Sequence, residues 1–284
     1  VPPDLRPWCA SGGGRLRDPQ PAMLPAHAEN RHALLVADTG AGKTLAGFLP
    51  TLADFAPSRA AIAPPPDGLH TLYVSPLKAL AVDVQRNLMA PIEALVLPIR
   101  EETRSGDTPA ARKARQRARP PHVLLTTPES LSLLLSYPES AALFAGLRRI
   151  VIDEIHAFAT GKRGDLLALA LSRLQALAPG LLRVGLSATI ADPGAYREWL
   201  APAGGAQTVR LVKGEAGAMP ELAILLPQGE RIPWSGHAAT WAIAQLYQAI
   251  REHRNTLVFT NTRFLAELVF QQLWEANEDR LPIG

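Results

Sequence analysis

Short apolar runs alternate with longer segments of helical spacing along most of the chain. Five runs rich in Val, Ile and Leu lie at 33–37, 71–74, 122–125, 149–152 and 182–186. Between them are segments with helical character, among them 43–55, 78–95 and 165–178. Strands that are apolar throughout, each followed by a helix, are typical of a parallel sheet with helices on both faces. The pattern predicts a complete α/β domain over residues 1–214.

The same alternation begins again near the end of the chain. Turn-rich sequence follows Trp199, and then strand-like runs at 221–226 and 256–259 alternate with helix-like runs at 237–250 and 263–274. About 70 residues are too few for a full sheet of this kind. We therefore expect residues 215–284 to form only the start of a second domain.

The composition fits a folded protein without disulfide bonds. Hydrophobic residues make up 47% of the 284 residues and charged residues 19%, which argues against a disordered chain. The single cysteine, Cys9, excludes an internal disulfide and a zinc site built from cysteines. No apolar stretch is long enough for a membrane span, and the first residues do not resemble a signal peptide. A cytoplasmic protein is expected.

The charge balance is slightly basic and dominated by arginine. The net charge is +3 and the pI is about 9.2. An arginine-rich composition is typical of high-GC genomes, and it also suits contact with phosphate groups. Charge alone does not decide between these two explanations.

The strongest local motif is the octet Ala-Asp-Thr-Gly-Ala-Gly-Lys-Thr at 37–44. It follows a predicted strand and opens a predicted helix, as a phosphate-binding loop requires. Its backbone N–H groups and the helix N-terminus favour negative charge. Lys43 is expected to reach the β- and γ-phosphates of ATP, and the Thr44 hydroxyl to bind Mg²⁺. The residues expected to bind ATP here are Asp38, Thr39, Gly40, Ala41, Gly42, Lys43 and Thr44.

A second motif places two carboxylates at the end of a buried strand. Asp153 and Glu154 follow the run 149–152, and His156 comes two residues later. Ligands of open α/β sheets bind at the carboxyl ends of the strands, where the octet also lies. Asp153 can hold Mg²⁺, and Glu154 can orient and deprotonate the attacking water.

Taken in order, these and other motifs resemble the DEXH type of superfamily 2 DNA/RNA helicases. Gln20 matches the glutamine that reads adenine in that family, the octet matches motif I, and Asp-Glu-Ile-His at 153–156 matches motif II. The remaining matches are Ser-Pro-Leu-Lys-Ala-Leu at 75–80 (motif Ia), Gly-Asp-Thr at 106–108, Thr-Pro-Glu at 127–129 (motif Ib), Ser-Ala-Thr at 187–189 (motif III) and 257–263 (motif IV). The resemblance implies two RecA-like domains, the second incomplete here, with ATP and Mg²⁺ as cofactors.

The resemblance also implies how the remaining motif residues act. Ser187 and Thr189 would couple the nucleotide to the nucleic acid, and His156 would join the catalytic set. Single-stranded DNA, with RNA as the alternative, would be contacted through its backbone. The residues implied are Pro76, Lys78, Gly106, Thr127, Thr260, Asn261 and Arg263. The basic run 112–119 and the pair Trp234 and Trp241 are weaker candidates, because a solvated helix and core aromatics explain them equally well.

The likeness narrows to large helicase-related proteins, and within them to the ligase-associated DEXH-box helicases of bacteria. The stretches 71–83, 106–112 and 231–237 carry it. It implies a role in DNA repair, with an ATP-dependent DNA ligase and a nuclease as partners. Two departures stand out: Pro21 and Pro25 fall where the family has an unbroken helix, and motifs V and VI are not among these residues. Motif VI supplies a transition-state arginine, so we expect the 284 residues alone to turn over little ATP.

Two other classes of function remain to be weighed. A transporter-type ATPase would need an LSGGQ-like signature, which this sequence lacks, and the Ser-Ala-Thr motif argues against it. A non-catalytic fragment that holds ATP and nucleic acid weakly is the other alternative. The motifs do not choose between DNA and RNA or between unwinding and annealing.

Overall fold

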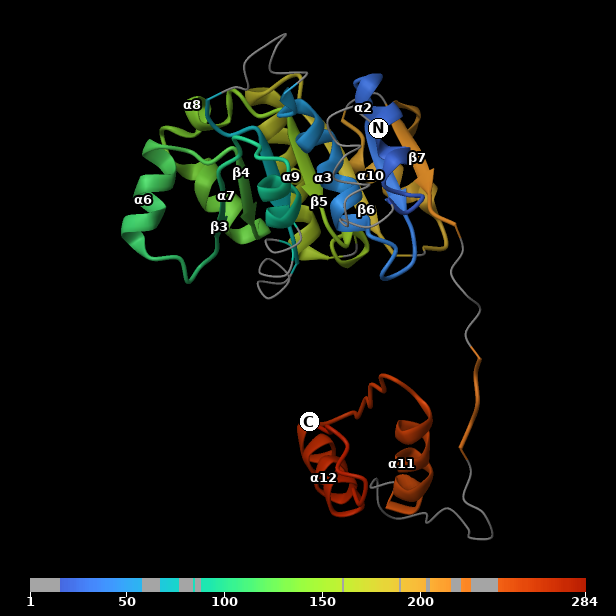
Figure 1. The fold of residues 1–284 in the computed structure, drawn as a ribbon. Coiled ribbons are helices and arrows are strands. Elements are labelled where there is room, and N and C mark those ends of the chain that lie inside the picture. The colour runs from blue at the N-terminus through green and yellow to red at the C-terminus, as the bar shows by residue number, and fades with distance from the viewer. Residues whose placement is uncertain are drawn as a thin grey trace. The chain divides into compact units, whose positions relative to one another are not determined.

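The computed structural model of the protein describes residues 16–57, 67–76, 84, 88–159, 161–188, 190–202, 205–215, 221–225 and 240–284. The chain divides into two compact units, Val1–Gly217 and Ala218–Gly284. The first unit is built on a seven-stranded parallel sheet with helices on both faces (Figure 1). The predicted α/β fold is confirmed.

The strand order places the strands that are followed by the predicted motifs next to one another. It is β3-β4-β2-β5-β6-β1-β7, and all six pairings are parallel. The strands are β1 (His32–Val36), β2 (Thr71–Val74), β3 (Glu101–Arg104), β4 (Val123–Thr126), β5 (Arg149–Ile152), β6 (Leu182–Ser187) and β7 (Val209–Lys213). The five predicted runs correspond to β1, β2, β4, β5 and β6. The sheet's two outer strands, β3 and β7, are not predicted, because a strand paired on one side need not be apolar throughout.

Helices cover the two faces of the sheet around separate cores. One face carries α7 (Pro128–Ser136), α8 (Ser140–Phe144), α9 (Lys162–Leu177) and α10 (Pro193–Leu200). The opposite face carries η2 (Pro21–Met23), α2 (Leu24–Ala28), α3 (Lys43–Asp54) and the helical residues 88–94. Alternate strand residues point to opposite cores, as in β2, where Leu72 and Val74 join the first and Tyr73 the second. Because helices cover both faces of the sheet, the ends of its strands are the accessible places for a functional site.

A few elements lie outside these layers. Helix α6 (Ala110–Ala118) runs beside β3 at one end of the sheet (Figure 1). The short turns η3 (Ile155–Ala157) and η4 (Ala206–Thr208) follow β5 and precede β7. None of the helices among the described residues is long and apolar enough to cross a membrane.

The second unit differs from its prediction. Helices η5 (Thr240–Ala242), α11 (Ile243–Glu252) and α12 (Arg263–Glu275) correspond to the predicted helical runs. The two predicted strands are wrong over their described residues, since the backbone of 221–225 and of 256–259 is irregular. Leu257 and Phe259 are 83% and 89% exposed. A strand forms by pairing, and the described part of this unit offers no second strand to pair with.

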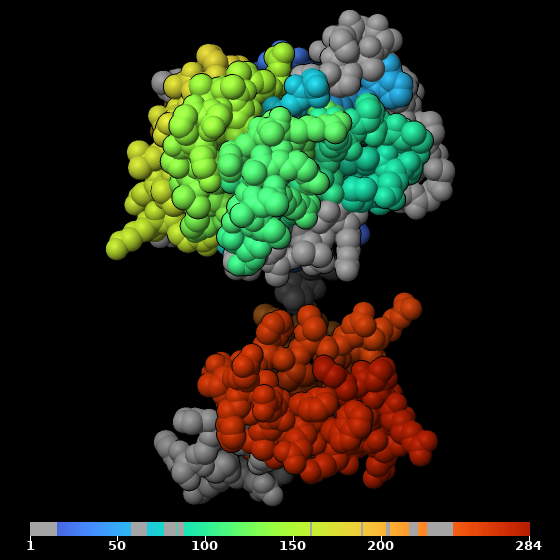
Figure 2. All heavy atoms as spheres, turned by 90° about the vertical axis from the view of Figure 1, so that its left-hand side faces the viewer, coloured from blue at the N-terminus to red at the C-terminus, as the bar shows by residue number. Residues whose placement is uncertain are grey.

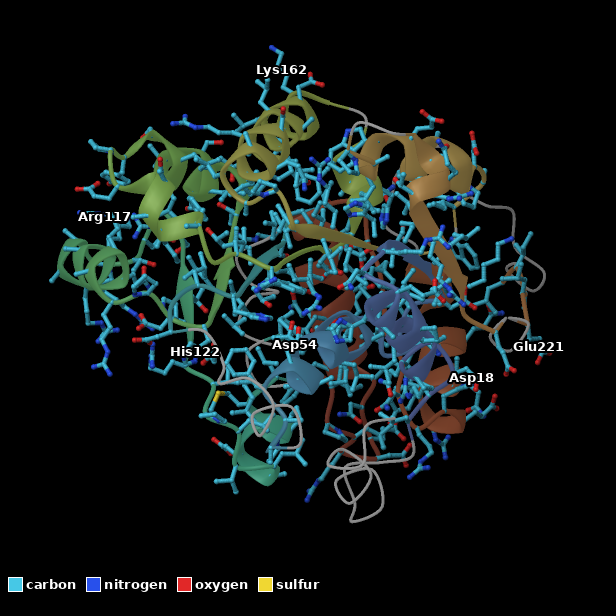
Figure 3. The ribbon with its side chains drawn as sticks, turned by 90° about the horizontal axis from the view of Figure 1, so that it is seen from above. Asp18, Asp54, Arg117, His122, Lys162 and Glu221 are labelled. Atoms are coloured by element: carbon cyan, nitrogen blue, oxygen red, sulfur yellow. The ribbon has the colours of Figure 1, made fainter. Side chains whose placement is uncertain are left out.

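A buried ionic cluster lies at the opposite edge of the sheet from the motifs. The fully buried Arg149 donates to Asp54 at the end of α3 (labelled in Figure 3) over 3.1 Å. His27 Nε2 and His70 Nε2 lie 3.3 and 3.5 Å from the same carboxylate. Burial alone would raise the pKa of Asp54, but hydrogen bonds from the two histidines and the charge of Arg149 hold it far below its ordinary value. The cluster fastens α2, α3, β2 and β5 together.

Replacing Asp54 by Asn is expected to lower the free energy of unfolding by about 3 kcal/mol at pH 7, because Arg149 would stay buried without its counter-charge. The depressed carboxyl pKa means that this stabilisation is complete above about pH 4 and is lost as the pH falls below it. Denaturant titrations at pH 7 and pH 3 measure both effects. Asp67→Asn, at an ion pair whose carboxylate is 95% exposed, serves as the control. Equal stability of wild type and Asp54→Asn at pH 7 would contradict this account.

Candidate active site

The octet forms a tight loop between β1 and α3 at the carboxyl edge of the sheet. Gly40 and Gly42 both have φ of +82°, in the left-handed region that favours glycine, and Gly42 caps α3. Lys43 is buried, and its Nζ donates to the carbonyls of Ala37 and Asp38 over 2.9 and 3.1 Å. The lysine therefore lies inside the curve of the loop. Thr39 and Gly40 at the tip of the loop are exposed.

Gln20 lies against this loop despite the neighbouring prolines. Its Nε2 donates to the Gly42 carbonyl over 3.3 Å, and its Oε1 accepts from the Arg17 N–H over 2.9 Å. Pro21 and Pro25 stand in the first turns of η2 and α2, where a missing N–H costs no helical hydrogen bond. The two prolines therefore leave Gln20 in contact with the loop. A side chain at position 42 would clash with the Gln20 amide, which is a second reason for glycine there.

The acidic pair follows β5, two strands from β1 in the sheet. Asp153 is only 6% exposed, and its Oδ1 accepts from the Glu154 N–H over 3.0 Å. Burial raises the pKa of the Asp153 carboxyl. Glu154 has a φ of +47°, a conformation that costs a residue with a side chain about 1–3 kcal/mol and that clusters at functional sites. The two carboxylates have different partners at the strand end, since Asp153 contacts Tyr73 and Glu154 contacts His156.

Tyr73, which the sequence did not single out, joins the loop to the acidic pair. It lies fully buried on β2, stacked on Phe48 of α3 with ring centroids 5.0 Å apart. Its hydroxyl donates to Asp153 Oδ2 over 2.5 Å, and the side chain of Thr44 lies close enough to lower its pKa slightly. Burial and the Asp153 charge raise the pKa of this phenol, which therefore keeps its proton. The sequence signal was a phenol hydroxyl in a short strand with a buried pattern.

His156 links the acidic pair to β6. Its Nδ1 lies 3.3 Å from Glu154 Oε2 and 3.0 Å from the hydroxyl of Ser187, which is buried at the end of β6. The Ser187 carbonyl in turn accepts from the Ala37 N–H at the start of the octet over 3.1 Å. Ser187 thereby contacts both motifs. Thr189, the other predicted coupling residue, lies outside the described residues.

The residues near Thr44 and Asp153 fit a magnesium ion. A hydroxyl and a buried carboxylate are the hard oxygen donors that Mg²⁺ prefers, and Mg²⁺ bound with phosphates uses few protein ligands. A cation would also offset the burial that raises the pKa of Asp153. No group of three or more His, Cys, Asp or Glu suited to a metal occurs in the described part of the chain.

Other predicted contacts lie at the ends of β2, β3 and β4, on the other half of the same edge. Pro76 follows β2, Gly106 follows β3, and Thr127 follows β4. The Gly106 carbonyl accepts from Lys113 over 2.8 Å. Thr127 is buried as the N-cap of α7, where its side chain accepts from the Ser130 N–H. Its hydroxyl therefore has a structural role in this state. Lys78 lies outside the described residues.

In the second unit, Thr260, Asn261 and Arg263 lie at and just before the start of α12. Asn261 and Arg263 are exposed, and Thr260 is half-buried. The Thr260 Oγ1 donates to the Thr262 carbonyl over 3.1 Å. Trp241 is half-buried in η5, and Trp234 is outside the described residues.

The basic run 112–119 forms most of α6, on the face turned to the viewer in Figure 2. Arg112 and Arg115 both donate to Glu102 of β3, over 3.1 and 2.8 Å. The Arg117 guanidinium lies 4.2 Å from the centre of the Tyr137 ring. These contacts dock the helix on its own domain, which supports the structural explanation of this run.

Comparison with known proteins gives consistent matches. The family model for DEAD/DEAH box helicases matches residues 17–195. The Lhr helicase/uracil glycosylase of Escherichia coli is 34% identical over 98% of this chain, and the ATP-dependent helicase Lhr-Core of Methanothermobacter thermautotrophicus is 33% identical over 95%. The chain spans only 20% and 33% of the length of these two relatives.

Solved structures of similar proteins agree with these relatives. The helicase Lhr of Mycobacterium smegmatis bound to ssDNA and AMP-PNP matches with a TM-score of 0.80 and 33% identity, covering 98% of this chain and 36% of that one. The DUF1998 helicase MrfA matches with a TM-score of 0.77 and 25% identity, covering 99% and 42%. The RecA-like fold and the helicase family predicted from the sequence are confirmed, and the chain belongs to the DEAD/DEAH box helicase family.

Proposed function

We propose that the protein hydrolyses ATP and uses the energy to move along single-stranded nucleic acid, DNA in the first place. The observation that carries the proposal is that the loop with Lys43 and the acidic pair Asp153 and Glu154 follow strands β1 and β5 at one edge of the sheet, where Tyr73 contacts Asp153 and His156 contacts Glu154. The M. smegmatis helicase Lhr, 33% identical, has been solved with ssDNA and AMP-PNP, which supports a nucleotide and a DNA strand as ligands.

The proposed roles follow from the chemistry of each side chain. Lys43, now donating to two loop carbonyls, would turn its ammonium to the β- and γ-phosphates. Thr44 and Asp153 would hold Mg²⁺, which supplies charge neutralisation at the phosphates when bound. Glu154 would orient the attacking water and accept its proton. Gln20 would contact the adenine from beside Gly42.

The nucleic acid is proposed to cross the ends of β2, β3 and β4. Backbone contacts would come from Pro76, Lys78, Gly106 and Thr127 and, in the second domain, from Thr260, Asn261 and Arg263. Contacts of this kind tolerate any base sequence. RNA in place of DNA remains the alternative.

The cellular setting is proposed from the likeness to ligase-associated helicases. It comprises DNA repair in the cytoplasm, with a DNA ligase and a nuclease as partners. We further propose that residues 1–284 alone turn over little ATP, because the transition-state arginine of the family belongs to a motif they do not contain. Such an arginine accelerates related reactions by about 10³–10⁵.

The proposal is tested by strand displacement with the full gene product. A labelled strand annealed to a tailed DNA or RNA duplex should be released with ATP and Mg²⁺ and retained with AMP-PNP. Release that is equally fast with AMP-PNP would overturn the proposal, because binding alone would then separate the strands.

Replacing Ser187 by Ala is expected to reduce strand displacement about tenfold while ATP hydrolysis stays within about threefold. The change removes the hydroxyl that contacts His156 but keeps the backbone bond to Ala37. Coupling between two sites is typically worth 5–150-fold. Both rates are measured on the same preparation, with Ser140→Ala, a buried serine of α8, as control. Parallel loss of the two activities would remove the coupling role.

A further inference from the structure

Arg163, in the first turn of α9, joins two loops at the carboxyl edge of the sheet. Its Nε donates to Glu129 Oε1 over 2.7 Å, and its Nη2 lies 3.4 Å from Glu129 Oε2. The same Nη2 donates to the Pro76 carbonyl over 3.0 Å. Pro76 follows β2, and Glu129 stands in the first turn of α7 after β4. One guanidinium therefore holds together the two loops that carry the proposed nucleic-acid contacts Pro76 and Thr127.

The start of α9 is also fixed to the acidic segment. The side chain of Phe158, two residues after His156, is buried, and the Arg163 guanidinium lies 5.7 Å from the centre of its ring. A side chain on Gly164 would run into the Phe158 carbonyl. Only glycine allows the first turn of α9 to lie directly on the Phe158 backbone. A shift of segment 153–158 would therefore displace the first turn of α9 and with it Arg163.

The Arg163–Glu129 pair contributes little to the stability of the fold. The two side chains are 47% and 51% exposed. Exposed ion pairs are typically worth about 0–1 kcal/mol. Glu129 nevertheless stays ionised: partial burial would raise its pKa, and the hydrogen bonds from Arg163 outweigh this and lower it. The planar guanidinium of Arg163 contacts both oxygens of the Glu129 carboxylate. Such a two-point contact fixes the relative orientation of the two side chains more than it stabilises the fold.

We infer that Arg163 is a positioning residue that ties the nucleic-acid loops at Pro76 and Glu129 to the acidic segment of the ATP site. The inference rests on the proposed function. It assigns to this chain a path within one domain, from Asp153 through Phe158 and Arg163 to both loops. Coupling between binding sites is reciprocal, so a bound nucleic-acid strand acts back on the acidic segment through the same contacts.

The test uses the full gene product and the variants Arg163→Gln, Glu129→Gln and the double variant. ATP hydrolysis is measured without and with a saturating single-stranded DNA or RNA oligonucleotide. Affinity for the labelled oligonucleotide is measured by anisotropy with and without AMP-PNP. Either single change should leave unstimulated hydrolysis within about twofold. Each should reduce both the stimulation and the effect of AMP-PNP on affinity about tenfold, within the usual range of coupling.

The double variant shows whether Arg163 and Glu129 act together or independently of each other. If Arg163 acts through Glu129, the double variant should lose no more stimulation than Arg163→Gln alone. Arg163→Lys, which keeps the charge but not the fork, should fall between wild type and Arg163→Gln. Arg173→Gln, at an exposed arginine on the same helix, should behave as wild type.

Three results would overturn the inference, and they are distinguishable. Stimulation of Arg163→Gln and Glu129→Gln equal to wild type would remove the inference and leave the proposed function in place. Unstimulated and stimulated rates that fall together with the thermal midpoint would show a purely structural role. A wild type that no oligonucleotide stimulates would overturn the proposed function, and the inference with it.

Discussion

Lys43→Ala is expected to abolish nucleic-acid-stimulated ATP hydrolysis in the full gene product, with a loss of at least 10²–10³-fold. A single preorganised donor at developing charge is typically worth that much. Lys43 is the only lysine of the loop, and its ammonium is already held at the loop by the carbonyls of Ala37 and Asp38. Hydrolysis is measured by phosphate release at saturating ATP.

The same variant should stay folded. The two carbonyls lose a donor, which costs about 1–3 kcal/mol if no water replaces it. Circular dichroism checks the fold, and Lys213→Ala, an exposed lysine on β7, is the matched control. Near-normal hydrolysis by a folded Lys43→Ala would show that the octet is not the phosphate site.

Glu154→Gln should bind ATP and Mg²⁺ as the wild type does but hydrolyse ATP about 10²–10⁴ times more slowly. Gln has the size of Glu and lacks its basicity, and general-base catalysis is worth about that factor. The unusual backbone of position 154 is tolerated by both side chains alike, so the geometry of Asp153 should survive.

Two measurements separate catalysis from binding in this variant. A fluorescent ATP analogue reports affinity with and without Mg²⁺, and phosphate release reports turnover. Glu198→Gln, an exposed glutamate of α10, controls for the change of charge. If affinity and turnover fell together, Glu154 would be a metal ligand or a structural residue and not the base.

The sequence predicted the centre of the fold and the motifs better than the edges. The inner strands such as β2 and β5 are mainly apolar and fully buried because both faces of the sheet are covered, and this leaves a clear pattern. Strand β3, with two glutamates and an arginine, has no such pattern because only β4 pairs with it. The strand predicted at 256–259 shows the converse, since an apolar run forms no strand without a partner.

The site was predictable where a motif fixes local geometry and not where distant segments meet. The octet specifies its own loop, so Lys43 and Thr44 could be placed from the sequence. Tyr73 and Arg163 act through contacts with residues 80 and 34–87 positions away, and no short motif encodes such contacts. The buried cluster around Asp54 was missed for the same reason.

The most direct test of the central claim is ATP hydrolysis by the full gene product with and without single-stranded nucleic acid. The account predicts slow hydrolysis alone and at least a tenfold rise with single-stranded DNA or RNA, dependent on Mg²⁺ and lost in Lys43→Ala. Hydrolysis that is absent under all conditions, or that no single-stranded oligonucleotide changes, would contradict it.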